Sequence, residues 1–412
     1  MNYAPEVAGV GRYTGEIGAH MASLGHEVFV VTTPAHYPGW APQGGPRSNR
    51  WSKETLDGAV VYRCPLYLHS QMRGIWRLLA PLSFALSSAP VAFWQILRLR
   101  PDVVIAVEPT LLVGPVTLFA AKLVGAKAVL HVQDLEVDAA FAMGHLRGGG
   151  MLSRLASSFD RVVTRGFDRV ITISNRMKAK LAQKGVKPEQ ITVVRNWVDL
   201  AQIQPLTRPS AYRAELGLAE GTFVVLYSGS IGAKQGVGML IDAARTLISD
   251  PSVLLVIAGQ GPMRGALERA AVSLSNIRVL DFQPEERFSE FLGLADLHVL
   301  PQEAQAADLM LPSKLGGMLA SGRPILVTAD ANTELAEFLG GSCSYTPPGD
   351  AQAFAASILR LRHESSARHQ EAERLALAEQ LSKSVVINAF VDSALFIPAP
   401  PAVSSDNFHI AA

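Results

Sequence analysis

Two lysines of this 412-residue chain stand where an extended segment turns into a helix, a position suited to binding negative charge. In "LYSGSIGAKQG", Gly229 and Ser230 precede Lys234, and in "DLMLPSKLGG", Ser313 precedes Lys314. Free N–H groups in a turn or at a helix N-terminus attract anions, and an ammonium group adds a full positive charge. We therefore predict a site for the diphosphate of a leaving group. The alternatives are a solvated surface lysine at Lys234 and an ordinary serine-capped helix at Ser313.

Glycines also precede two other predicted helices. "VIAGQGPMRGALE" places Gly259 and Gly261 where bare backbone could approach a nucleoside, although a lone G-x-G is only moderately specific. "NYAPEVAGVGRYTGE" places Gly9 and Gly11 before an amphipathic helix, and a plain helix-entry loop is the alternative. A doubly wound domain needs a strand just ahead of such a loop, and only the first two residues are available there. We therefore predict that a native first strand is missing.

Residues suited to proton transfer cluster after another predicted strand. "VLHVQDLEVDAAF" contains His131, Asp134, Glu136 and Asp138, and Glu108 follows a neighbouring strand. Side chains at the carboxyl ends of parallel strands face the ligand crevice, where a carboxylate or imidazole could orient a sugar hydroxyl or stabilise positive charge. We predict His131 and Asp134 as catalytic residues. For Glu136 and Asp138, capping of the next helix is an equally good interpretation.

Short β-branched runs alternate with helical patterns along most of the chain, which predicts parallel sheets covered by helices. The predicted strands are Val28–Thr32, Val103–Val107, Ala128–Val132, Val170–Ile173, Phe223–Tyr227, Val253–Ala258, Ile277–Leu280, Asp296–Leu300 and Pro324–Val327. The predicted helices are Tyr13–Leu24, Gly114–Val124, Arg176–Lys184, Gly236–Ser249 and Arg264–Leu274. A proline-containing segment near residue 200 predicts two doubly wound α/β domains, 1–200 and 201–397, with a ligand cleft between them. Residues 398–412 are predicted to be a disordered tail.

The composition is that of a folded protein, with 49% hydrophobic and 18% charged residues, which excludes a disordered chain, a collagen-like fibre and a small disulfide scaffold. The two cysteines, Cys64 and Cys343, have no metal-binding spacing, so we predict no metal and a reducing, cytoplasmic setting. A net charge of +1 gives no indication of nucleic-acid binding. However, residues 1–200 hold 22 basic and 14 acidic side chains (+8), and residues 201–412 hold 15 and 22 (−7), which suggests different partners for the two halves.

One segment of the basic half is apolar enough to meet lipid. Leu78–Leu97 has no charged residue and just reaches the roughly 20 residues that span a bilayer, but its prolines, glutamine and serines favour a buried or interfacial helix. Residues 147–187 contain ten Lys or Arg and only two acids. We predict peripheral association with an anionic membrane, at the inner face of the plasma membrane. A solvated helix surface is the alternative.

These segments, together with "GHEVFVVTTPAHYPGW" and "LGGMLASGRPIL", resemble the GT-B glycosyltransferases of family 4, and within them the exopolysaccharide group that includes colanic acid biosynthesis glycosyltransferases. The resemblance runs from Asn2 to about Leu326. It implies the GT-B fold, with two Rossmann-like domains, and transfer with retained anomeric configuration. The implied donor is a nucleoside-diphosphate sugar, held mainly by the C-terminal domain, with no cofactor. The basic half suits a polyprenyl-diphosphate-linked or oligosaccharide acceptor.

The resemblance also implies roles for single residues. Gly9 and Gly11 are expected near the donor phosphates, and Lys234 is expected to bind them. Glu6 and Glu108 are expected on the acceptor side.

The chain departs from the family pattern at two points. Many members carry an arginine a few residues before the position of Lys234, where this chain has Ser230 and Ile231. The second of the family's paired glutamates falls on Gly317. We expect Asp308, on the nucleoside side, and Lys314 to substitute in part. A GT-B sugar-nucleotide epimerase and a non-catalytic nucleotide-binding homologue therefore remain alternatives to a transferase.

Overall fold

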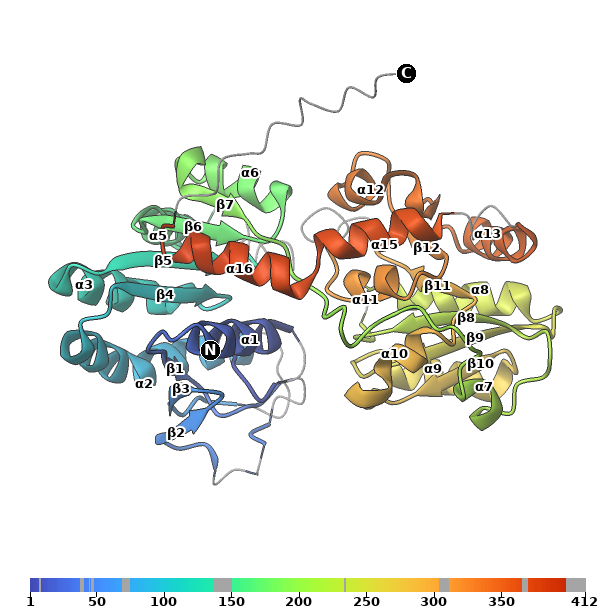
Figure 1. Cartoon of the computed structure of the whole chain (residues 1–412), viewed down its shortest axis with the longest axis horizontal. Coiled ribbons are helices and arrows are strands. Elements are labelled where there is room, and N and C mark those ends of the chain that lie inside the picture. Colours follow the sequence, from blue (N-terminus) through green and yellow to red (C-terminus); the bar gives the residue numbers. More distant parts are fainter. Residues whose placement is uncertain are drawn as a thin grey trace, which may run out of the picture. The chain divides into compact units, whose positions relative to one another are not determined.

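The computed structural model describes residues 1–6, 9–37, 41–43, 45, 48–68, 75–135, 150–232, 235–303, 311–364 and 370–397. The chain forms two compact units (Figure 1). Unit 1 comprises Met1–Thr172, Leu181–Val194 and Ile387–Ala412, and unit 2 comprises Ile173–Lys180 and Arg195–Val386. The predicted boundary at residue 200 lies close to the crossing at Arg195. The predicted domain 201–397 differs at its end, because the chain returns to unit 1 at Ile387.

Unit 1 contains two sheets. The first has the order β1–β3–β2, with β1 parallel and β2 antiparallel to β3, and the second is fully parallel with the order β4–β5–β6–β7. The strands are β1 Phe29–Thr32, β2 Ser52–Leu56, β3 Ala59–Arg63, β4 Val103–Glu108, β5 Lys127–Val132, β6 Arg169–Thr172 and β7 Ile191–Val193. The helices are α1 Gly9–Ser23, α2 Ile75–Leu99, α3 Gly114–Val124 and α5 Met151–Arg165, with short 3-10 turns at Leu111–Val113 and Pro188–Gln190. Helices α6 (Asn175–Gln183) and α16 (Lys383–Ala394) each carry the chain between the units.

Helix α1 begins at Gly9, so Gly9 and Gly11 lie in its first turn and not in a loop before it, which corrects the sequence-based placement. The glycines of this helix allow the N-terminal segment to pack directly on its backbone. A Cβ atom at Gly18 would lie 2.3 Å from the Tyr3 hydroxyl, and one at Gly15 would lie 2.8 Å from the Ala4 Cβ. Since real Cβ atoms do not approach so closely, small residues are required on this face.

Unit 2 is a single parallel sheet with the order β10–β9–β8–β11–β12–β13. Its strands are β8 Phe223–Ser228, β9 Val253–Ala258, β10 Ile277–Leu280, β11 Leu297–Leu300, β12 Ile325–Thr328 and β13 Ser344–Thr346. Renumbered within the unit, this is the 3-2-1-4-5-6 order of a dinucleotide-binding fold, and the order reverses between β8 and β11. In such sheets a ligand binds at the carboxyl ends of the strands that flank this switch point.

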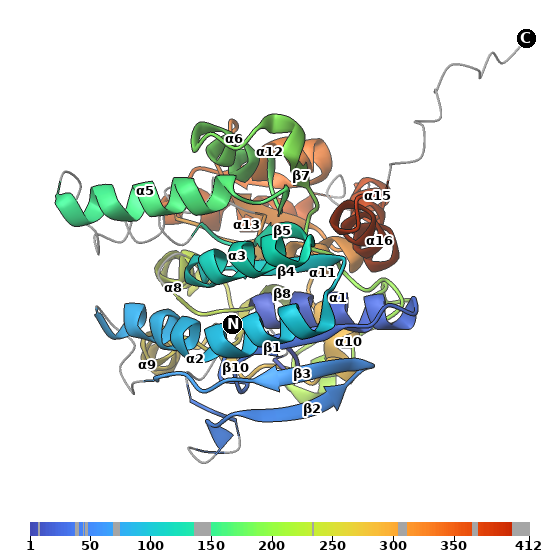
Figure 2. The ribbon, with the colours of Figure 1, turned by 90° about the vertical axis from the view of Figure 1, so that its left-hand side faces the viewer.

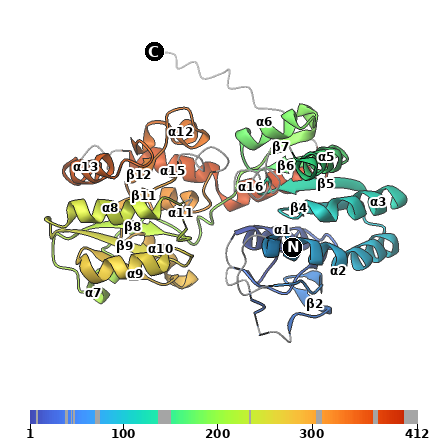
Figure 3. The same ribbon diagram turned by 180° about the vertical axis from the view of Figure 1, so that it is seen from behind.

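Alternating side chains of these strands form a core on each face of the sheet. Val225 and Tyr227 pack with α8, α9 and α13, whereas Val224 and Leu226 pack with α7 and α10. Figure 3 shows the unit from the opposite side to Figure 1. The helices are α7 Tyr212–Glu215, α8 Val237–Leu247, α9 Arg264–Ser273, α10 Phe288–Leu292, α11 Leu315–Ala320, α12 Glu334–Leu339, α13 Ala351–His363 and α15 Glu371–Gln380, with 3-10 turns at Glu285–Arg287 and Gly340–Ser342.

All nine predicted strands are present, each with ends within one residue of the prediction. The charge-free segment predicted as a helix forms α2. The tail 398–412, predicted to be disordered, lies outside the described residues, and the predicted missing first strand stays a prediction.

Candidate active site

The carboxyl end of β8 carries a compact group of residues that we call the Lys314 cluster: Tyr227, Gly229, Ser230, Gly259, Gly261 and Lys314. The Lys314 ammonium group donates to the Tyr227 hydroxyl oxygen at 2.7 Å, and its Nζ lies 3.9 Å from the centre of the same ring. The Tyr227 hydroxyl in turn donates to the Ser230 carbonyl oxygen at 2.5 Å. This chain of contacts holds the lysine against the turn that follows β8, beside the switch point.

The glycines are needed because the turns after β8 and β9 lie in direct backbone contact. The Ile231 N–H donates to the Gln260 carbonyl oxygen at 2.8 Å. A Cβ atom at Gly259 would lie 1.8 Å from the Gly229 carbonyl oxygen, and one at Gly261 would lie 2.2 Å from the Ile231 carbonyl oxygen. Gly259 and Gly261 therefore let the two turns approach each other. Their approach to a nucleoside stays a prediction.

Lys314 is the charged group of the cluster. Burial lowers the pKa of its ammonium group to about 7. Among the described residues no carboxylate pairs with it, and its polar contacts there are the hydrogen bond to the Tyr227 hydroxyl and the contact with the Tyr227 ring. A partly buried cation that lacks a counter-ion is expected to bind an anion strongly, because the anion restores the stabilisation that burial removed. The helix that follows, α11, is short, so charge and not a helix dipole is the main attraction.

Of four predicted donor-side residues, two are described by the structure and two are not. Ser230 and Ser313 are exposed, and Ser313 also borders a small cavity shared with Asn196 and Trp197. Lys234 and Asp308 lie outside the described residues.

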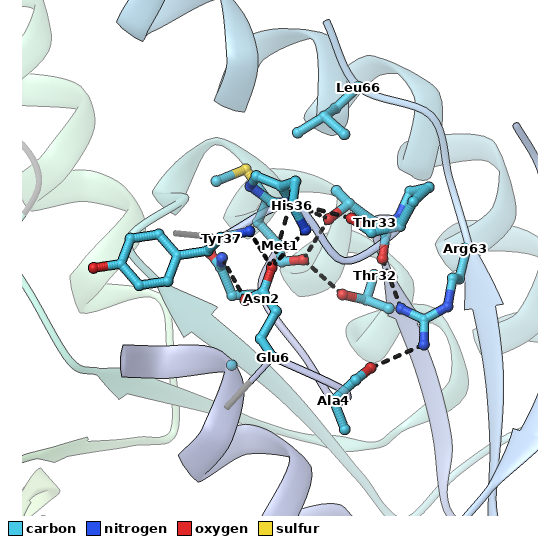
Figure 4. A network of polar contacts seen from close by, with 12 residues as sticks. Met1, Asn2, Ala4, Glu6, Thr32, Thr33, His36, Tyr37, Arg63 and Leu66 are labelled. Carbon is cyan, nitrogen blue, oxygen red and sulfur yellow. Dashed lines mark hydrogen bonds and ion pairs between the residues drawn. The ribbon is translucent and has the colours of Figure 1, made fainter. Parts of the chain in front are cut away.

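In unit 1, the predicted acceptor-side residue Glu6 is buried, with 3% of its surface exposed (Figure 4). Its Oε1 accepts the backbone N–H groups of His36 and Tyr37 at 3.0 and 3.1 Å, and its Oε2 accepts the Asn2 side-chain amide at 2.8 Å. A Cβ atom at Gly11 would lie 2.3 Å from Oε2, so the glycine is required for the carboxylate to sit against the first turn of α1. Glu6 therefore fixes the segment that follows β1.

His36 is a residue of this network that the sequence did not reveal. Its Nδ1 lies 3.1 Å from the Pro34 carbonyl oxygen, 3.2 Å from the Thr33 hydroxyl and 3.4 Å from Glu6 Oε1. Because a carbonyl oxygen can only accept, the contact with Pro34 places the proton of the neutral ring on Nδ1. Burial lowers the pKa of His36, against the opposing effect of the Glu6 charge. No motif marks this histidine, since only folding brings it to Glu6.

His131, predicted as catalytic, is 1% exposed and packs against the Phe390 ring of α16, with 4.7 Å between ring centres. Burial lowers its pKa to about 3, so the imidazole is neutral. Its Nε2 lies 3.0 Å from the Gln133 side-chain nitrogen. Glu108 is also 1% exposed, whereas Asp134 is partly exposed. The burial favours Asp134 over His131 for contact with a substrate.

Unit 2 offers a cation at a nucleotide-type switch point, and unit 1 offers a buried carboxylate–histidine network. Comparison with known proteins identifies the family of the chain. Residues 8–197 match the model of the glycosyl transferase 4-like domain, and residues 222–364 match that of the glycosyl transferases group 1. The chain is 38% identical over 95% of its length, and 97% of the relative's, to WcaI of Escherichia coli K12, whose name assigns it to colanic acid biosynthesis as a glycosyl transferase.

The chain belongs to the group 1 family of glycosyltransferases.

Solved structures agree with this assignment at the level of the fold. The glycosyltransferase superposes on sucrose-phosphate synthase of Thermosynechococcus elongatus with a TM-score of 0.71 and 15% identity, over 93% of this chain and 92% of the other. It superposes on HepE of Anabaena, solved with UDP-glucose, with a TM-score of 0.64 and 17% identity, over 90% and 100% of the two chains. The predicted GT-B fold is confirmed. The roles of the individual site residues stay predictions.

Proposed function

We propose that this glycosyltransferase moves a sugar, with retention of anomeric configuration, from a nucleoside-diphosphate sugar to a saccharide acceptor in exopolysaccharide biosynthesis. The observation that carries the proposal is the Lys314 cluster at the switch point of unit 2, in the segment that matches the group 1 model. The name of WcaI supports the pathway class, and the HepE complex supports a nucleotide-sugar donor.

The reaction breaks the bond between the anomeric carbon and the diphosphate oxygen, and the acceptor oxygen forms the new bond while its proton leaves. Negative charge therefore grows on the departing diphosphate. The position of Lys314, partly buried against Tyr227, supports a role for its ammonium group in neutralising this charge. We expect Lys234 to contribute a second positive charge. We propose that these side chains supply the positive charge without a metal ion. Addition of EDTA should then leave turnover unchanged.

The acceptor is proposed to be carried on polyprenyl diphosphate, and the enzyme to work in the cytoplasm at the inner face of the plasma membrane. The +8 charge of residues 1–200 supports an anionic, membrane-bound acceptor. Glu6 holds His36 and Tyr37 in place, so we propose that this segment positions the acceptor and that Glu6 acts through it.

The test is an incubation of the protein with UDP-, GDP- and dTDP-sugars, with and without a polyprenyl-diphosphate-linked saccharide. We expect a lengthened saccharide, with NMR showing the same anomeric configuration as in the donor. Lys234→Ala should lower kcat by roughly a hundredfold or more. Lys383→Ala, which removes a partly exposed lysine paired with Asp199 in the same unit, should not.

Other outcomes discriminate the alternatives. Near-normal transfer by a correctly folded Lys234→Ala variant would contradict the donor assignment. Conversion of the nucleotide-sugar without any acceptor would identify an epimerase, and binding without turnover would identify a non-catalytic homologue.

A further inference from the structure

In unit 1, helix α3 packs against both α2 and α5, and Figure 2 shows the three helices on the same side of the unit. The Phe93 ring of α2 stacks on the Phe119 ring of α3, with 6.0 Å between centres. Helix α3 approaches α5 closely at Gly114, where a Cβ atom would lie 2.4 Å from the Val163 side chain. The three helices therefore form one continuous layer, which we call the α2–α3–α5 face.

The solvent side of this face is unusually apolar. Leu86 is 70% exposed, Trp94 63% and Met151 79%. The exposed large apolar side chains of the face, with those of the turn that enters α3, are Leu82, Leu86, Trp94, Leu112, Phe119, Leu123, Met151, Leu155 and Val162. Single exposed apolar residues need no explanation, but a group of this size on adjacent elements marks an interaction surface.

The same face is positively charged. The exposed charged side chains of its helices are Arg98, Lys122, Arg154, Arg161 and Arg165. Just after α2, Arg100 and Asp102 are both exposed and their charges offset each other. The sequences of the three helices contain one acid, Asp160, which is 4% exposed and paired with Lys184 at 2.6 Å. The face therefore presents cations and apolar side chains without any exposed carboxylate from its helices.

We propose that the α2–α3–α5 face lies flat on an anionic membrane, with its apolar side chains in the outer part of the lipid layer and its cations at the headgroups. Exposed apolar side chains together with surplus Lys and Arg are the combination that interfacial helices use. This inference deepens the proposed function and rests on it for the lipid-linked acceptor. The face itself is argued from exposure and charge alone.

Helix α2 does not need to cross the membrane for this. Leu79–Leu99 is long and apolar enough to span a bilayer by length and composition. However, Ala80, Phe84 and Ile96 are buried in unit 1, and Phe84 belongs to a core cluster with Cys64 and Leu66. A spanning helix would have to give up these contacts. The helix is thus fixed to the protein on one side and is free to contact lipid on the other.

The structure also shows which basic side chains of the predicted segment are available to contact lipid headgroups. The sequence pointed to all of residues 147–187, but Arg176 donates to the Asn332 carbonyl oxygen in unit 2, and Lys184 is paired with Asp160. Arg165 likewise donates to the Lys184 carbonyl oxygen at 2.8 Å. Arg154 and Arg161 of α5 therefore remain, and α3 adds Lys122, which the sequence did not single out.

The test is flotation of the full chain with vesicles of phosphatidylglycerol and phosphatidylcholine, against pure phosphatidylcholine, at low and high salt. We expect binding to the anionic vesicles that weakens as salt rises. The variant K122Q/R154Q/R161Q should lower the partition coefficient by about fivefold per cation. The variant L86Q/F119Q/L155Q should lower it by roughly tenfold or more. The matched control I248Q/V272Q/V385Q changes exposed apolar residues of unit 2 and should bind as the wild type does.

Several outcomes would overturn the inference. The first is a wild-type protein that does not bind anionic vesicles at low salt, and the second is a set of face variants that float as the wild type does. The third is a wild-type dimer in ultracentrifugation that the face variants abolish, because this would show that a second copy of the chain covers the face. Transfer to a short, water-soluble acceptor separates this inference from the proposed function. The face variants should keep that activity. A wild-type protein that floats with the vesicles but transfers no sugar would contradict the proposed function and leave this inference standing.

Discussion

At the residue scale, the most informative group is Lys314. Its pKa of about 7 in the free protein means that it is protonated below pH 7 and largely neutral above it. A bound diphosphate favours the charged form and raises the pKa, so binding above pH 7 requires uptake of a proton. We expect the affinity for UDP-glucose to be constant below pH 7 and to fall by up to about tenfold per pH unit above it.

Calorimetry checks this expectation. Titrations at pH 8 in buffers of different ionisation enthalpy should show uptake of about one proton. Lys314→Met should bind more weakly and lose the pH dependence, whereas Lys383→Met should keep both. A wild-type affinity that is flat from pH 6 to pH 9 would show that Lys314 does not contact the diphosphate.

The sequence revealed the glycines, the serine and the lysine of the Lys314 cluster, but not Tyr227, to which the lysine donates. The pattern of glycine, serine and lysine at strand ends is local, so Gly229, Gly259 and Lys314 could be singled out directly. The Tyr227 hydroxyl looks like any strand tyrosine until Lys314 folds against it. His131 shows the opposite case, because its strand-end position suggested a crevice, yet α16, more than 250 residues later, covers it.

At the scale of elements, one buried carboxylate fixes the start of α6. Glu334 is 3% exposed and accepts the backbone N–H groups of Asn175 and Arg176 at 2.8 and 2.7 Å. These are the first residues of α6, and because N–H groups in the first turn of a helix have no acceptor within the helix, they favour a negative charge nearby. Glu334→Gln removes the charge and one acceptor, so it should lower the free energy of unfolding by about 2 kcal/mol.

Urea unfolding followed by tryptophan fluorescence measures this cost. Glu337→Gln is the matched control, because Glu337 lies on the same helix but its side chain is 62% exposed. We expect the control to change stability by less than about 0.5 kcal/mol. Equal stability of the two variants would mean that the Glu334 contacts contribute nothing beyond solvation.

The elements that the sequence predicted well are those with a strong local pattern. Buried parallel strands are continuous apolar runs, and β9 matches its prediction at both ends. Three of the strands that were not predicted, β2, β7 and β13, lie at sheet edges; β2 is largely exposed, and β7 and β13 have only three residues each. The fourth, β3, is the central strand of its sheet and is apolar and largely buried, so neither its position nor its sequence pattern explains why it was missed. The start of α1 was misplaced because Gly9 and Gly11 look like a loop in the sequence. Only the fold shows that a Cβ atom at Gly11 would clash with Glu6, so that a glycine is needed inside the first turn of the helix.

At the scale of the whole molecule, the two units have separate cores and, on the proposals above, separate ligands. Because the Lys314 cluster belongs entirely to unit 2, UDP-glucose should stabilise that unit by mass action, by about 2.7 kcal/mol at a hundred times its Kd. Anionic vesicles should instead protect the α2–α3–α5 face of unit 1. Hydrogen exchange read by peptide distinguishes the two effects. The amides of β8 and β9 should slow with UDP-glucose, those of α2, α3 and α5 should slow with vesicles, and Lys314→Met should lose only the first response. Protection by UDP-glucose that is equal in both units, or that persists in Lys314→Met, would contradict this separation, because a ligand can stabilise only the states to which it binds preferentially.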